Sequence, residues 1–321
     1  MHDVVGRMEE KMKKSVCKFL SADGETQIHA VKWEPEQGKI AGILQISHGM
    51  IEYVERYETF AEYLTGKGFV VVGNDHLGHG ASVRSQDDWG YFAPQKGSDI
   101  VVEDLHQLRL KTQKEYPGVP YFMLGHSMGS FLLRKYLSIH GEGLSGAIVM
   151  GTGTQTDMTV KIGKAACKTI ALFRGWKYRG GFVEKQVFSA NNKRFAQEGD
   201  SAWLTKDRDI VSAYRKEPRC TFQFTLNGFY NLFDTIYYIN RPEHFAAIPK
   251  DLPLIFLSGE DDPVGNYGAG AKKAYETYVQ AGIADIGLKL YPADRHEILN
   301  ELDKEVVYED IYGWLQKHLP R

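Results

Sequence analysis

Residues 121–130 have the sequence YFMLGHSMGS, in which a short apolar run leads to a serine that stands between two glycines. Apolar side chains at helical spacing follow directly, from Phe131 to Leu137. This order predicts a buried strand, a sharp corner and a helix. A serine at such a corner, in the pattern Gly-x-Ser-x-Gly, holds its hydroxyl clear of the sheet. Ser127 is therefore the candidate nucleophile.

Strand and helix patterns alternate on both sides of this corner. Apolar runs typical of buried strands occupy residues 41–46, 69–72, 120–124, 147–150, 252–257 and 286–290. Helical patterns lie between most of these runs, over residues 57–67, 99–116, 128–140 and 268–281, and another follows the last run, over residues 303–318. Two alternating segments, 16–20 and 28–33, predict an antiparallel hairpin before them. The alternation predicts an α/β fold whose central sheet is mostly parallel and covered by helices on both faces.

The stretch 152–248 interrupts this alternation, because it has no clear strand pattern and is rich in aromatic residues. We expect it to form a mainly helical cap, inserted into a core made of residues 1–151 and 249–321. Residues 152–245 contain fifteen Lys and Arg against nine Asp and Glu. This excess is consistent with peripheral contact of the cap with an anionic lipid surface, with an anionic substrate head group, or with a solvated basic face.

The overall composition excludes several classes of protein. A formal net charge of -2 argues against nucleic-acid binding, which needs a strong basic excess. No apolar stretch is long enough to span a membrane, and residues 1–14 lack the apolar region of a secretory signal, so we expect a cytoplasmic protein. The three cysteines form no C-x-x-C pair. His76 and His79 have no further ligand cluster beside them in the sequence, and we interpret them as structural.

A serine nucleophile needs a general base, and the base needs an acid that orients it. Three acids, Glu260, Asp261 and Asp262, follow the predicted strand at 252–257, and His296 follows the one at 286–290. The carboxyl ends of parallel strands meet at one edge of a sheet, so these groups are expected near Ser127. The spacing alone leaves the choice among the three acids open.

Ester or amide cleavage also needs two backbone amides that stabilise the oxyanion. The amide of Met128, directly after Ser127, is one candidate. The other is the amide of Met50, in the turn Ser47-His48-Gly49-Met50 after the first parallel strand. The alternative for Met50 is a side chain that only packs in the turn.

Motifs along most of the chain carry a resemblance to a known family. They are His48-Gly49-Met50-Ile51-Glu52 with Arg56-Tyr57, Asp75-His76-Leu77-Gly78-His79-Gly80, Gly125 to Ser130, Gly259 to Pro263, and Arg295 to Glu301. With them the chain resembles the monoacylglycerol lipase and lysophospholipase branch of the α/β-hydrolases, often grouped as serine aminopeptidases. The resemblance implies hydrolysis of carboxylic esters through an acyl-enzyme, without metal or organic cofactor. It also favours Asp262 as the acid, because the residue before Pro263-Val264 is similar to the family's acid position.

The resemblance further implies that Glu52 and Arg56 face the head group of a small-molecule acyl ester, such as a monoacylglycerol or a lysophospholipid. An ion pair that braces the loop is an equal alternative. Some members carry a second histidine where this chain has Leu299, so glycerol recognition is not implied. An aminopeptidase with the same triad, a peroxide-dependent perhydrolase and a ligand-binding receptor without turnover stay open. The sequence does not predict the oligomeric state.

Overall fold

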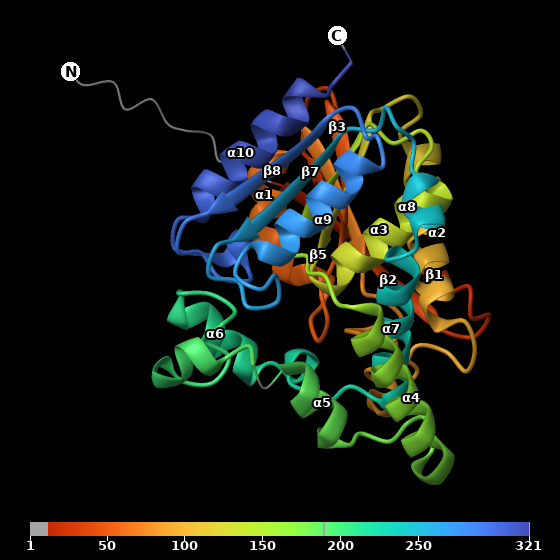
Figure 1. The fold of residues 1–321 in the computed structure, drawn as a ribbon. Helices are drawn as coiled ribbons and strands as arrows, with labels where there is room; N and C mark the ends of the chain where they lie inside the picture. Colours follow the sequence, from red (N-terminus) through yellow and green to blue (C-terminus); the bar gives the residue numbers. More distant parts are fainter. Residues whose placement is uncertain (1–11, 189, 321) are drawn as a thin grey trace.

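A computed structural model describes residues 12–188 and 190–320, so the first eleven residues of the predicted core lie outside it. Its centre is one eight-stranded sheet in the order β1-β2-β4-β3-β5-β6-β7-β8 (Figure 1). The strands are β1 (Met12–Leu20), β2 (Gln27–Pro35), β3 (Gly42–Ser47), β4 (Phe69–Asn74), β5 (Tyr121–His126), β6 (Gly146–Met150), β7 (Leu254–Gly259) and β8 (Ile286–Tyr291). The β1–β2 and β2–β4 pairs are antiparallel, and all other pairs are parallel. The prediction of a mostly parallel α/β sheet is confirmed.

Helices cover both faces of this sheet. One face packs against α1 (Glu58–Thr65) and α10 (Lys304–Lys317), and the other against α2 (Gly97–Glu115), α3 (Met128–His140) and α9 (Ala269–Gln280). In β4, Val70 and Val72 join the second of these cores, whereas Phe69 and Val71 join the first. Successive side chains of a strand point to opposite faces, so a central strand buried on both sides needs a continuous apolar run.

The stretch 152–248, which we call the insertion, leaves the sheet after β6 and returns before β7. Its described residues form only helices and loops: α4 (Asp157–Arg174), α5 (Gly181–Phe188), η3 (Lys193–Glu198), α6 (Arg208–Lys216), η4 (Pro218–Cys220), α7 (Leu226–Ile239) and α8 (Pro242–Ala246). The hydroxyls of Thr156 and Thr225 cap α4 and α7 by accepting amide hydrogen bonds. Figure 1 shows α4, α5 and α6, in green, at the end of the molecule opposite the last turn of α10, whereas α8 lies beside α2 and α3.

Short 3-10 helices lie in the connections of the core, at η1 (Val54–Tyr57), η2 (Gln86–Asp88) and η5 (Ile298–Asn300). No helix in the described part of the chain is long and apolar enough to cross a bilayer.

Candidate active site

Ser127 occupies the corner between β5 and α3 with φ 53° and ψ -121°, a conformation that L-residues rarely adopt. Both neighbouring glycines are required there. A Cβ on Gly125 would collide with the carbonyl of Gly129, and one on Gly129 would collide with the carbonyl of Ser47. The amide of Ser127 donates to the carbonyl of Met150 on β6 at 3.0 Å, which ties the corner to the sheet. The predicted strand, corner and helix are therefore present, and the role of Ser127 as nucleophile stays a prediction.

Asp262 and His296 come from loops that follow β7 and β8, and they meet beside this corner. Nδ1 of His296 lies 3.0 Å from Oδ1 of Asp262, and both residues are buried. A ring N–H that donates to the carboxylate leaves Nε2 as the basic nitrogen of the imidazole. Ser127 and His296 line the same cavity, whose volume is about 1450 Å³. A serine, a histidine and an acid are the groups that nucleophilic catalysis by serine needs, and their action as a triad stays a prediction.

The two rival acids have other surroundings. Glu260 is exposed, and Asp261 forms an ion pair with Arg194 at 2.7 Å. Asp262 instead accepts a hydrogen bond from the amide of Val264 at 2.9 Å, which fixes its carboxylate beneath the imidazole. Of the three acids, Asp262 is the one that contacts His296.

Both candidate oxyanion amides lie at the cavity. Met50 and Met128 line it together with Ser127, and a Cβ built on Gly49 would stand 3.2 Å from Cβ of Ser127. Within the described residues, the Met50 amide donates to no acceptor. Met128 is the first residue of α3, where a helix leaves its amides without an internal partner. Two free amides beside the serine can stabilise a developing oxyanion, and this role stays a prediction.

Glu52 and Arg56 belong to a network of buried charges. Arg56 donates to Glu52 at 2.6 Å and forms two parallel hydrogen bonds, of 2.8 and 2.7 Å, with the carboxylate of Glu297. Glu52 and Glu297 line the cavity, whereas Arg56 is not among the described residues that do so. Of the two alternatives for Arg56, these contacts favour the ion pair that braces the loop. Glu297 was not identified from the sequence, although it directly follows His296.

His126 is a second member of this network that the sequence did not identify. Its Nε2 lies 3.2 Å from the carbonyl of His296, and its Nδ1 lies 3.3 Å from Glu52. Nδ1 also lies 3.1 Å from the hydroxyl of Tyr57, whose own proton goes to Glu52. Both ring nitrogens therefore face acceptors and are expected to carry a proton. Burial opposes a charge on His126, but the Glu52 carboxylate outweighs it and raises the pKa of the imidazole above its usual value. Burial would likewise raise the pKa of Glu52, yet His126 and Arg56 hold it well below its usual range.

His76 and His79 form part of a buried group of rings with His48. The rings of His48 and His76 lie 4.1 Å apart, and the amide of His76 donates to Nε2 of His48 at 2.9 Å. Burial lowers the pKa of His79 to about 3, so this ring is neutral. Neither histidine belongs to a three-ligand cluster with metal-binding spacing among residues 12–188 and 190–320.

The insertion supplies most of the apolar wall of the cavity. The wall residues from the insertion include Val160, Phe182, Phe222, Leu232, Phe233 and Ile236. Of the five aromatic residues of α7, Phe229, Tyr230, Phe233, Tyr237 and Tyr238, only Phe233 is among the described residues that line it. Of the other four, Phe229 is buried in the larger hydrophobic cluster, and Tyr230, Tyr237 and Tyr238 are partly buried against it.

Comparison with known proteins shows the family of this chain. The profile of the family described as serine aminopeptidase, S33, matches residues 38–303. A monoacylglycerol lipase of Mycolicibacterium smegmatis is 24% identical over 94% of this chain and 96% of its own length. The monoglyceride lipase of Homo sapiens is 25% identical over 93% of this chain and 89% of its own.

A solved structure of an esterase is also similar to this chain. A thermostable carboxyl esterase from Bacillus coagulans, in complex with glycerol, superposes with a TM-score of 0.89 at 30% identity, covering 97% of this chain and all of that one. The resemblance predicted from the sequence motifs is confirmed. The chain belongs to the serine aminopeptidase S33 family of α/β-hydrolases, within which it is similar to the monoacylglycerol lipases.

Proposed function

We propose that the chain is a serine hydrolase that cleaves monoacylglycerols, lysophospholipids or related acyl esters through an acyl-enzyme. Esterases and lipases are the relatives that support carboxylic-ester hydrolysis as its activity. The observation that carries the proposal is the buried His296–Asp262 pair at 3.0 Å, on the same cavity as the strained Ser127.

In this mechanism Ser127 attacks the ester carbonyl while His296 takes the hydroxyl proton. Asp262 orients the ring and stabilises the imidazolium. The amides of Met50 and Met128 donate to the oxyanion of the tetrahedral intermediate. His296 then protonates the leaving alcohol, and a water molecule, activated by the same ring, releases the acid from Ser127. The proposed steps use protein groups and water alone.

The lining of the cavity supports an acyl ester as the substrate. Apolar side chains of the insertion, which acts as a cap in this proposal, suit an acyl chain, and a cavity of about 1450 Å³ has room for one of medium or greater length. Glu52 also lines the cavity, and we place the head group beside it. The sequence-based expectation of a cytoplasmic location is retained as part of the proposal.

A lipid surface is the proposed source of such substrates. Leu172 and Phe173, at the end of α4, are each 83% exposed, and Phe182 of α5 is 64% exposed. Exposed cations, among them Lys168, Arg174 and Lys185, lie in the same helices. Large apolar side chains beside basic residues suit the boundary of an anionic bilayer. We therefore assign peripheral lipid contact to this part of the insertion.

An aminopeptidase is the second candidate, and the contacts of Glu52 disfavour it. An aminopeptidase needs a carboxylate with free oxygens for the substrate ammonium. The oxygens of Glu52 already accept from Arg56, Tyr57 and the amide of Gly49. Comparing aminoacyl anilides with acyl esters as substrates separates the two activities.

Replacing the nucleophile tests the proposal directly. Ser127→Ala should abolish hydrolysis across p-nitrophenyl esters, monoacylglycerols and lysophospholipids, and it should abolish labelling by a fluorophosphonate. Ser138→Ala, in the same helix region but bonded to the carbonyl of Lys135, is the matched control and should keep full activity. Wild-type turnover by Ser127→Ala would refute the proposed nucleophile.

A further inference from the structure

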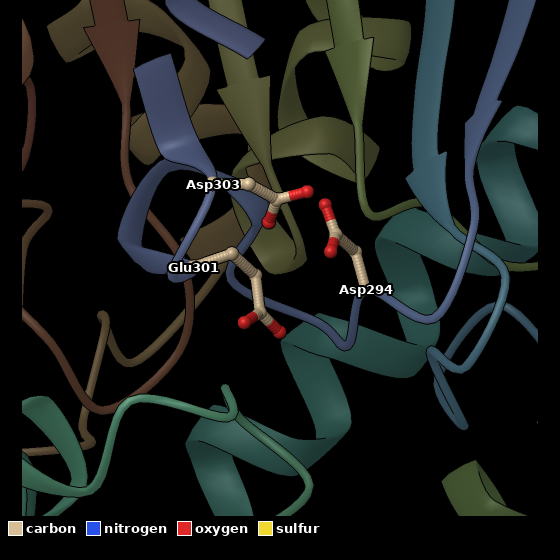
Figure 2. Close-up of side chains that lie close together, drawn as sticks. All are labelled: Asp294, Glu301 and Asp303. Carbon is tan, nitrogen blue, oxygen red and sulfur yellow. The ribbon is translucent and has the colours of Figure 1, made fainter. Parts of the chain in front are cut away.

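A second group of charges lies beside the loop that carries His296, on its insertion side. It contains Asp294, Glu301 and Asp303, and Figure 2 shows the carboxylates of Asp294 and Asp303 turned toward each other. Asp294 and Glu301 are fully buried. One oxygen of each of the three side chains lies within 4.8 Å of the others, a spacing that would suit a cation.

The chain itself supplies this cation. Nζ of Lys206 lies 2.7 Å from Asp294 and 3.8 Å from both Glu301 and Asp303. Lys206 belongs to the insertion, whereas the three acids belong to the loop of His296 and the start of α10. The group is therefore an ionic link between the two parts of the cavity wall.

Backbone hydrogen bonds extend this link on both sides of His296. The amide of His296 donates to the carbonyl of Trp203 at 3.4 Å, and that of Glu297 donates to the carbonyl of Leu204 at 2.7 Å. Residues 203–206 therefore lie alongside the His296 loop.

Glu301 joins the two segments a second time. It accepts from the amide of Arg295 at 2.9 Å and from that of Lys206 at 3.1 Å. Arg295 in turn binds the insertion through the carbonyl of Ala202, at 2.6 Å, and the carboxylate of Glu198. The backbone directly before the catalytic base is thus fixed by groups of the insertion.

We propose that Lys206 is a positioning residue for His296, because its ammonium binds Asp294 and Glu301 and so holds residues 203–206 of the insertion against the loop of the base. This inference rests on the proposed role of His296. Loss of Lys206 would leave buried carboxylates without their counter-charge, which is strongly unfavourable. Oδ2 of Asp294 already lacks a hydrogen-bond partner in the described residues. Burial raises the pKa of Asp294 to about 6 against the opposing effect of Lys206. The loop would relieve this charge by moving or by taking up a proton.

The test compares Lys206→Ala, Lys206→Arg and, as a matched control, Lys216→Ala, an exposed cation at the end of α6. A soluble p-nitrophenyl ester is the substrate, and a fluorophosphonate titrates the active sites. A displaced base lowers the rate of chemistry, since small misplacements cost up to about a hundredfold. We expect kcat per titrated site to fall about ten- to a hundredfold in Lys206→Ala, while KM changes less than about threefold. Lys206→Arg should restore most of kcat, and Lys216→Ala should match the wild type.

A general loss of folding would lower the number of titrated sites and leave kcat per site unchanged, so that result would overturn the proposal. If Lys206→Ala does not fold, the double variant Lys206→Met with Asp294→Asn is used in its place, because it removes the charge of the carboxylate nearest to Lys206. A wild-type kcat in that double variant would also overturn it. Failure of the proposed function gives a different result from failure of this inference, because Ser127→Ala would then retain activity.

Discussion

Side chains at the strand ends are buried, whereas those on the outer face of the insertion, at Leu172 and Phe173, are exposed. Asp262 and His296 are 0% and 2% exposed, and the sheet fixes the backbone of Ser127. Leu172 and Phe173 of the insertion are each 83% exposed. The difference indicates a division of labour, in which the strand ends, held by the sheet and by residues 203–206, set the reaction geometry and the outer face of the insertion sets access to it. Substitutions at the strand ends should then slow the hydrolysis of every ester, whereas those on the outer face should matter only for substrates in lipid.

The largest effect is expected at Asp262. In Asp262→Asn the amide can donate to Nδ1, which favours the imidazole tautomer whose Nε2 carries the proton. The base is then lost, and losses of about 10⁴-fold in kcat are typical of such a change. The measurement is kcat on soluble p-nitrophenyl butyrate. Asp261→Asn, whose carboxylate pairs with Arg194 away from the imidazole, should remain close to wild type. Similar losses in both variants would contradict the assignment of the acid.

A smaller effect is expected at Met50, where two substitutions separate backbone from side chain. Met50→Pro removes the amide that we place in the oxyanion hole, and loss of one such donor costs about 10²- to 10³-fold in kcat. Met50→Ala keeps the amide and should stay within about threefold of wild type. The two variants are compared by kcat per site, after titration with a fluorophosphonate. Equal losses would mean that the methionine acts through packing alone.

The same comparison explains how far the sequence could predict the molecule. The strands and the Ser127 corner were predictable, because a continuous apolar run and paired glycines are local signals with one structural solution. The position of the loops with Asp262 and His296 was then predictable too, since the carboxyl ends of parallel strands meet at one edge of a sheet.

Contacts between charged side chains were not predictable. Arg56 and Glu297 are 241 residues apart, and no periodicity indicates which distant carboxylate a buried arginine meets. The family resemblance put Arg56 at the substrate, whereas the structure surrounds it with carboxylates. Lys206 was missed for the same reason, because its partners follow a strand far along the chain and its own segment has no regular pattern.

The smallest effect is expected on the outer face of the insertion. The double variant Leu172→Ser with Phe173→Ser removes two exposed apolar side chains that would enter the boundary of a bilayer. Full burial of such a side chain is worth about 1.5–3 kcal/mol, so partial burial of two should make vesicle binding about tenfold weaker on removal. Sedimentation with vesicles of mixed neutral and anionic lipid measures this binding. Hydrolysis of p-nitrophenyl butyrate should not change, because neither side chain is among the described residues that line the cavity.

A matched control tests whether this loss belongs to the insertion. Leu110 and Ile139 are 53% and 47% exposed on α2 and α3, and their replacement by serine removes comparable apolar surface from the core. If the core variant lost vesicle binding equally, lipid contact would be a general property of the surface and the contrast between the two regions would fail. Added salt should weaken binding of the wild type and of the insertion variant alike, since the cations of α4 remain in both. The apolar and electrostatic contributions are then separable, and only the apolar one depends on Leu172 and Phe173.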